Sequence, residues 1–180
     1  MNEPGFRVAD THTIGHAGFL QVDELDVVPP DGSMVKRVVV RHPGAVAVVP
    51  IHDDQLLLIR QYRAAVDEDL LEIPAGKLDV AGEPPLATAR RELEEEIGFR
   101  ASLWEPLGRF YTTPGFSDEL MYLFVAYELT PVPLAPVGPE EEESEIVSIQ
   151  ISEIPALIDS GEVRDAKTLI ALWWVVAGRR

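Results

Sequence analysis

Residues 90–99 of the 180-residue chain read RRELEEEIGF, a helix-like segment with an unusual distribution of charge. Glu92 and Glu96 are four residues apart, and Glu94, Glu95 and Glu96 are consecutive. Like charges four residues apart repel each other across one helical turn, so this arrangement destabilises an isolated helix. Either the glutamates form a solvated acidic face, which is the common origin of a charge run, or the protein uses them together.

The expected helix runs from about Pro84 to Ile97, and Gly98 follows as a typical helix-ending residue. At 100° per residue, Leu93 and Ile97 fall on one stripe that can face a core. The acidic residues beside this stripe, within about a third of the circumference, are Glu92, Glu95 and Glu96. Hard divalent cations require several carboxylate oxygens that converge from a rigid element. A bound Mg²⁺ would therefore offset the repulsion between these side chains, and the site would need all of them together.

Further residues stand in register with this helix. Glu83 precedes Arg91 by seven intervening residues, Arg91-Glu92 follows, and Gly98 comes after the glutamates. Together with Gly76, this order resembles the Nudix box, G-x5-E-x7-R-E-U-x-E-E-x-G-U, in which U is a bulky apolar residue. The one departure is that six residues, instead of five, separate Gly76 from Glu83. The extra residue falls in a loop, where added length costs little, and it leaves the carboxylate register unchanged.

The resemblance implies an α/β fold, an α/β/α sandwich around a mixed sheet, with the box as a loop-helix unit. It also implies hydrolysis of a nucleoside diphosphate linked to another group, with Mg²⁺ or Mn²⁺ as the cofactor. Glu92 and Glu96 correspond to metal ligands in that family, Glu95 can assist them, and the backbone carbonyl of Ala75 usually joins them. Arg91 is expected to orient these carboxylates.

Three further features resemble the ADP-ribose pyrophosphatase branch of the family. They are RQYR at 60–63, LEIPAGK at 71–77, and Pro114, which lies fifteen residues after Phe99. This branch cleaves ADP-ribose to AMP and ribose 5-phosphate. Pro114 alone could be an ordinary turn proline, because the chain has 15 prolines.

The resemblance also implies substrate contacts. Arg63, and less directly Arg37, match arginines that bind the pyrophosphate, although both could be charges at strand edges. The remaining matched positions are Gly115 and Glu119 in the loop around the terminal ribose, and Phe19 beside the adenine. Glu72 is expected to brace the box.

In this branch the catalytic base comes from a late acidic loop. The segment PEEEESE at 139–145 supplies such a loop. Aligned on the following strand, Glu142 is the expected base and a further metal ligand, and Glu143 is the alternative. Glu140 and Glu141 are expected to be solvated loop charges.

Composition limits the partners. The formal net charge is −16 and no run of Lys or Arg is present, so nucleic acid and anionic membranes are not expected to bind. No cysteine is present, which excludes disulfides and Cys-bound zinc. The N-terminal residues show neither the basic region nor the apolar region of a secretory signal peptide, so a cytoplasmic protein is expected.

Two domains are expected, a β-rich segment at 1–42 and a Nudix hydrolase domain at 43–180. In the first, residues 18–28 and 35–42 read as a β-hairpin around PPDGS. It resembles an N-terminal dimerisation piece, and its many apolar positions predict a homodimer.

Two alternatives stay open. One keeps the fold and changes the substrate to another nucleoside diphosphate derivative. The other is a non-catalytic ADP-ribose-binding module, although such modules usually lose the box glutamates that are intact here.

Overall fold

The computed structural model describes residues 5–178, so residues 1–4 of the predicted first domain lie outside the described part. The chain divides into two compact units, which are described separately. The first consists of the described part of Met1–Gly44 together with Phe110–Met121, and the second of Ala45–Arg109 with the described part of Tyr122–Arg180. The predicted assignment of 1–42 to dimerisation and of 43–180 to the hydrolase domain remains a prediction.

The first unit contains a three-stranded antiparallel sheet in the order β1 (Arg7–Ala17), β2 (Leu20–Val28), β3 (Val35–Arg41). The predicted hairpin is confirmed as β2 and β3. Strand β1 was not predicted, because its sequence RVADTHTIGHA has no apolar alternation and its pairing with β2 contains two irregularities.

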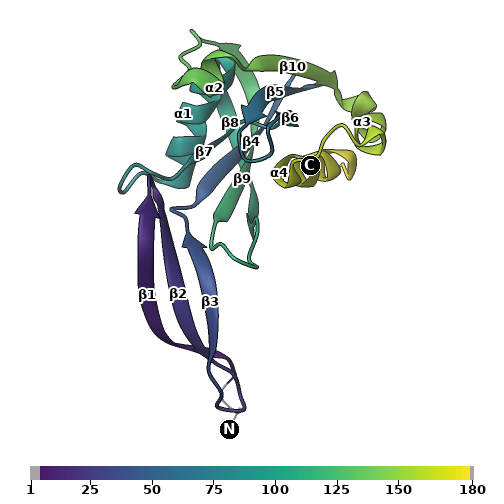
Figure 1. The fold of residues 1–180 in the computed structure, drawn as a ribbon. Helices are drawn as coiled ribbons and strands as arrows, with labels where there is room; N and C mark the ends of the chain where they lie inside the picture. The colour runs from purple at the N-terminus through teal and green to yellow at the C-terminus, as the bar shows by residue number, and fades with distance from the viewer. Residues whose placement is uncertain (1–4, 179–180) are drawn as a thin grey trace. The chain divides into compact units, whose positions relative to one another are not determined.

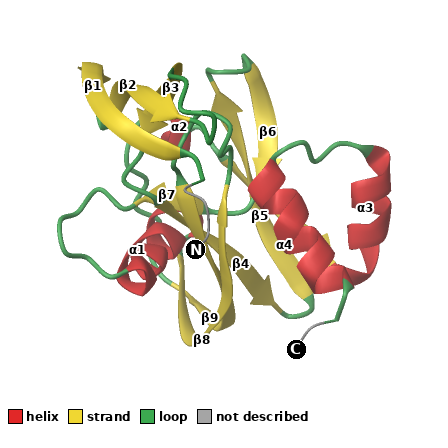
Figure 2. Cartoon of the chain, turned by 90° about the horizontal axis from the view of Figure 1, so that it is seen from below, coloured by secondary structure: helices red, strands yellow, loops and turns green. Residues whose placement is uncertain are grey.

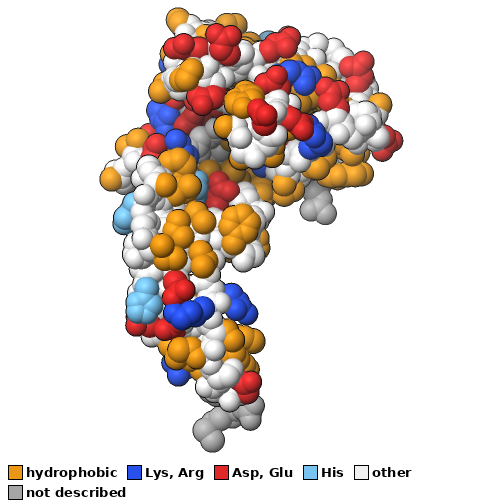
Figure 3. Space-filling model, in the orientation of Figure 1, with side chains coloured by type: hydrophobic (Ala, Val, Ile, Leu, Met, Phe, Trp, Pro, Cys, Tyr) orange, Lys and Arg blue, Asp and Glu red, His pale blue; other side chains and the backbone are white. Residues whose placement is uncertain are grey.

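Large apolar side chains are exposed on this sheet and on the turns that flank it, and Figure 3 shows several of them gathered on one face. They are Phe6, Val8, Ile14, Phe19, Met34 and Val38. A small sheet that exposes this many apolar side chains has surface to bury against a partner.

The second unit is built on a larger sheet (Figure 1). Its strand order is β10 (Glu145–Gln150), β5 (Gln55–Arg63), β4 (Ala45–His52), β9 (Leu120–Pro131), β8 (Phe99–Tyr111). Two short strands extend it, since β6 (Glu68–Glu72) pairs with β5 and β7 (Ala75–Lys77) pairs with β4. Strand β4 is buried along most of its length, as its continuous apolar sequence predicts.

Helices lie on both sides of this sheet, α1 (Pro85–Ile97) on one side and α3 (Ile154–Ser160) with α4 (Ala166–Val176) on the other (Figure 2). A 3₁₀ turn at Ile151–Glu153 leads into α3. Leu93 and Ile97 of α1 pack into the core, and Gly98 ends the helix at φ 66°, as predicted. The predicted α/β sandwich is confirmed, and no described helix is long and apolar enough to cross a bilayer.

Two local predictions were wrong. The sequence EDLLEIPAGKLD reads as a strand that ends at Pro74, Ala75 and Gly76, but it forms two strands, β6 and β7, with a break at Ile73 and Pro74. Proline has no N–H to donate to a neighbouring strand, and the Ile73 N–H donates to the Thr168 hydroxyl instead. The acidic segment expected to be a plain loop contains a short helix, α2 (Pro139–Glu142).

Candidate active site

The loop and the helix of the box meet at two glutamates. The Ala75 N–H donates a hydrogen bond of 2.9 Å to Glu96 Oε2. At Gly76, a Cβ atom would lie 1.9 Å from Glu92 Oε1, so any side chain there would collide with this carboxylate. The 75–76 backbone therefore packs directly against Glu92 and Glu96, and glycine is required by this close approach.

Glu92 and Glu96 are deeply buried for acidic side chains, with 6% and 4% of their surface exposed. Burial raises the pKa of Glu92 to about 7, and the neighbouring charges of Glu95 and Glu141 act in the same direction. Burial also raises the pKa of Glu96 to about 8, against the hydrogen bond from Ala75. The charge of Glu92 also raises the pKa of Glu96. Two interacting acidic groups in a buried site are stable as anions only if a positive charge joins them.

Arg91 supplies part of that charge. Its Nη1 atom lies 2.8 Å from Glu92 Oε1 and 2.7 Å from Glu95 Oε2, and its Nη2 atom lies 3.7 Å from Glu83. Glu83 also accepts a hydrogen bond of 2.7 Å from the Thr88 hydroxyl. As predicted, Arg91 orients the box carboxylates. Its ion pairs are with Glu83, Glu92 and Glu95, and Glu96 is not one of its partners.

These residues fit a hard divalent cation. The donors are carboxylate oxygens beside the backbone of β7, and oxygen ligands are those that Mg²⁺ prefers. Glu92 and Glu96 are also buried without full neutralisation of their charge. Among the described residues, no three Asp, Glu, His or Cys side chains form a complete set of metal ligands. The ligand set therefore stays a prediction, with Glu92 and Glu96 as its best-supported members.

The late acidic segment holds the candidates for the catalytic base. In α2, Glu141 is half-buried and Glu142 is exposed, and Glu143, which follows the helix, is also exposed. The charge of Glu141 contributes to the raised pKa of both Glu92 and Glu96, although burial is the larger cause at each. Glu141 was expected to be a solvated loop charge. Its carboxylate accepts a hydrogen bond of 2.6 Å from the Val137 N–H, which precedes the short helix.

Of the five predicted substrate contacts, only Arg63 belongs to the second unit. Its guanidinium binds the buried Glu72 through two hydrogen bonds, Nε to Oε1 at 2.8 Å and Nη2 to Oε2 at 2.7 Å. Glu72 thus holds Arg63 in place, in addition to its predicted position next to the box.

The other four lie in the first unit. Arg37 is exposed on β3 and donates to the Lys36 carbonyl, and Gly115 is also exposed. The Phe19 ring meets His42 edge-on with centroids 5.2 Å apart. Glu119 accepts a hydrogen bond from the Thr112 hydroxyl and lies 3.5 Å from His42 Nε2. Their roles in binding substrate stay predictions.

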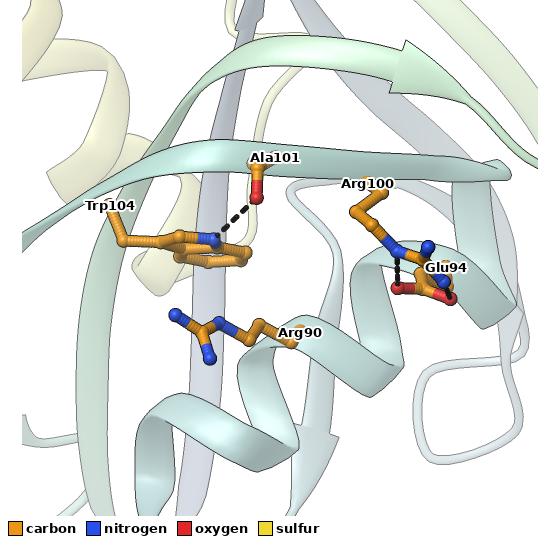
Figure 4. Close-up of a pocket in the computed structure, with 5 residues that line it drawn as sticks. All are labelled: Arg90, Glu94, Arg100, Ala101 and Trp104. Atoms are coloured by element: carbon orange, nitrogen blue, oxygen red, sulfur yellow. Dashed lines mark hydrogen bonds and ion pairs between the residues drawn. The ribbon is translucent and has the colours of Figure 1, made fainter.

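A pocket of about 260 Å³ lies on another face of α1 (Figure 4). Its lining residues are Arg90, Glu94, Arg100, Ala101 and Trp104. Arg90 and Glu94 are about half a helical circumference away from Glu92 and Glu96, so this pocket is separate from the carboxylate site. Glu94 is occupied there by Arg100, at 2.7 and 2.9 Å.

We expect Gly76→Ala to weaken activation by Mg²⁺ at least about tenfold, because the added methyl group would displace the Glu92 carboxylate. Gly15→Ala is the matched control, since a Cβ atom there meets no atom within 4 Å. Activity measured across a Mg²⁺ titration separates the two variants. Equal Mg²⁺ dependence in both would show that the close approach at Gly76 has no role in the site.

The raised pKa values predict that the metal-free protein loses stability as the pH rises. The folded-state pKa values of Glu92 and Glu96, about 7 and 8, lie above the ordinary value of 4.5. The folded state therefore binds more protons than the unfolded state between about pH 4.5 and 8, and its free energy of unfolding falls over that range, by an amount on the order of a few kcal/mol. Urea unfolding in EDTA from pH 5 to 8 measures this loss. Glu96→Gln should reduce the slope, and a slope unchanged by that substitution would contradict the assignment.

Comparison with known proteins gives one consistent family. A model of the NUDIX domain matches residues 41–172, a range that includes the whole segment from Gly76 to Phe99. An ADP-ribose pyrophosphatase of Bacillus subtilis (strain 168) is 40% identical over 151 residues, which cover 83% of this chain and 81% of that protein. A methanol dehydrogenase activator of Bacillus methanolicus is also 40% identical, over 157 residues that cover 87% of this chain and 83% of that protein.

A solved structure extends the comparison to the fold. The crystal structure of an ADP compounds hydrolase is similar with a TM-score of 0.83 and 27% sequence identity. The similarity covers 99% of this chain and 95% of that one. The likeness thus includes the N-terminal strands as well as the sheet that carries the carboxylate site.

Proposed function

Since this chain belongs to the NUDIX family, we propose that it hydrolyses the pyrophosphate of ADP-ribose to AMP and ribose 5-phosphate, or that of a close ADP-sugar to AMP and the corresponding sugar phosphate. The observation that carries this proposal is the buried pair Glu92 and Glu96, held against the backbone of Ala75 and Gly76. The substrate class is supported by the ADP-ribose pyrophosphatase of B. subtilis and by the ADP compounds hydrolase.

The reaction needs charge neutralised on the phosphate oxygens and a water molecule that can lose a proton. Bound Mg²⁺, or Mn²⁺, held by Glu92 and Glu96 with Glu95 and the Ala75 carbonyl, would supply that neutralisation. Arg91 keeps Glu92 and Glu95 oriented, and the Ala75 N–H fixes one oxygen of Glu96. In the proposed site, Arg63 binds the pyrophosphate.

The proton acceptor in this proposal comes from the late acidic segment. The resemblance to the family, counted from the strand that follows, favours Glu142, with Glu143 as the alternative. The structure favours Glu141, because it is the half-buried member of the three and its charge acts on both buried box glutamates. A base must reach the water beside the substrate, so we propose Glu141 as the first candidate and keep Glu142 as the second.

The remaining assignments follow from the resemblance. Arg37 would add a second contact to the pyrophosphate, and Phe19 would lie beside the adenine. Gly115 and Glu119 would surround the terminal ribose. We also propose a homodimer and a cytoplasmic location.

A panel of substrates tests the function. We expect ADP-ribose to have the highest kcat/KM among ADP-ribose, ADP-glucose, GDP-mannose, NADH and a diadenosine polyphosphate, with Mg²⁺ and with Mn²⁺. A preference of tenfold or more for another compound would assign the enzyme to a different nucleoside diphosphate derivative. Tight binding of ADP-ribose without turnover under either metal would instead support the non-catalytic binding module.

The dimer can be tested on the exposed apolar face of the N-terminal sheet. Val38 on β3 is 53% exposed, and Val38→Asp should convert a dimer to a monomer in light scattering, because a buried unpaired charge is unfavourable at an interface. Val66→Asp is the matched control, since Val66 is 54% exposed and belongs to the second unit. A wild-type protein that is monomeric at every concentration would contradict the dimer, and a dimeric Val38→Asp would move the interface elsewhere.

A further inference from the structure

A buried carboxylate links the C-terminal helix to a predicted substrate contact. Glu72, at the end of β6, is only 1% exposed. One side of its carboxylate is occupied by Arg63 through the two hydrogen bonds already described. The Lys167 ammonium binds the same Oε2 atom that receives Arg63 Nη2. Glu72 therefore pairs with two cations that come from distant parts of the sequence.

The first turn of α4 holds Lys167 in this position (Figure 2 shows α4 beside β6). Asp165 caps the helix, since its Oδ2 atom accepts from the Thr168 N–H at 2.9 Å and from the Thr168 hydroxyl at 2.6 Å. The same oxygen lies 3.1 Å from Lys167 Nζ. Thr168 Oγ1 in turn accepts from the Ile73 N–H at 2.9 Å, next to Glu72. Lys167 and Thr168 are both buried, so water cannot take over the hydrogen bonds that their side chains make.

The hydrogen bonds leave one edge of Arg63 available. Glu72 uses Nε and Nη2 of the guanidinium, whereas Nη1 is not part of this fork, and the Arg63 side chain is about 40% exposed. Burial alone would raise the pKa of Glu72, but the hydrogen bonds from Arg63 and the charge of Lys167 outweigh it, so this pKa lies below its ordinary value. The carboxylate is thus an anion.

Charge balance explains why Lys167 matters to Arg63. The four groups Arg63, Lys167, Glu72 and Asp165 sum to zero formal charge. Without Lys167 the remaining three would sum to −1, next to the arginine that is predicted to bind an anionic pyrophosphate. A negatively charged site repels a phosphate. In addition, without Lys167 the charge of Glu72 would be neutralised by Arg63 alone, which would leave less of the positive charge of Arg63 for the substrate.

We propose that Lys167 is a positioning residue for substrate binding, which acts through Glu72 to orient Arg63 and to keep its free edge available to the pyrophosphate. This inference rests on the proposed function, because it takes the role of Arg63 from there. Lys167 itself does not touch the substrate.

The experiment measures the Kd of ADP-ribose by calorimetry in EDTA, where no hydrolysis interferes, and KM and kcat with Mg²⁺. Lys167→Met should raise Kd and KM about tenfold and change kcat by less than about threefold, since the lost interaction is one of binding. Lys167→Arg should restore most of the affinity. Leu172→Ala, at a fully buried position of the same helix, is the control for general destabilisation and should lower Tm without changing Kd.

A double-mutant cycle identifies the route of the effect. If Lys167 acts through Arg63, Lys167→Met should change Kd by less than twofold in an Arg63→Ala background. Fully additive effects of the two substitutions would overturn the proposal, as would a Lys167→Met variant that loses Tm and keeps its Kd. If wild-type protein binds another diphosphate but not ADP-ribose, the proposed substrate is wrong and the same cycle is measured with that ligand. A wild-type protein that binds no diphosphate would overturn both proposals.

Discussion

Glu96→Gln should lower kcat for ADP-ribose by at least about 100-fold and leave the fold intact, because even outer contacts of a metal site are worth 10–100-fold. Glu96 is 4% exposed, and the amide oxygen of glutamine can still accept the hydrogen bond from the Ala75 N–H. The amide cannot replace the lost negative charge at a site for a hard cation. Kinetics at saturating Mg²⁺, with circular dichroism to check the fold, measure the effect.

Glu94→Gln is the matched control for the loss of a helix charge. Glu94 is on the opposite side of α1, where it binds Arg100, so its loss should change kcat by less than about twofold. In metal-free buffer, Glu96→Gln should also raise Tm, since a buried acidic group with a raised pKa is replaced by a neutral one. If Glu96→Gln keeps a normal rate, Glu96 is a buried structural carboxylate and not a metal ligand.

The sequence predicted the box helix well because two independent signals agree there. Leu93 and Ile97 have the spacing of a buried helical stripe, and Gly98 adopts the left-handed conformation that ends the helix. The helical period placed Glu92, Glu95 and Glu96 on one part of the helix circumference. The resemblance to the Nudix box, and not the period, singled out Glu92 and Glu96 as expected metal ligands.

Tertiary contacts determine what the sequence did not predict. Strand β1 is defined by its pairing with β2, and not by any alternation of its own. The break between β6 and β7 depends on Thr168, which accepts the Ile73 N–H from 95 residues away along the chain. The network around Glu72 likewise joins residues that are 95 positions apart, so nothing local indicates that Lys167 belongs to it.

The second large effect is expected in the late acidic segment. Glu141→Gln should lower kcat by roughly 10²-fold with a smaller change in KM, which is the usual effect of losing a general base. The short helix α2 leaves Glu141 half-buried and places its charge where it acts on Glu92 and Glu96, whereas Glu142 and Glu143 remain exposed. The rate of the variant should recover partly at high pH, because hydroxide can replace the activated water.

Glu142→Gln and Glu143→Gln provide the comparison within the same segment, and we expect both to retain kcat within about threefold, as exposed charges on one short helix do. Each of the three substitutions removes one negative charge, so a uniform loss of activity would indicate a general electrostatic effect. If Glu142→Gln alone is inactive, the assignment made from the sequence is correct and α2 must turn when substrate binds. If all three variants keep normal rates, the base lies outside this segment, and Glu95, which Arg91 holds beside Glu92, becomes the next candidate.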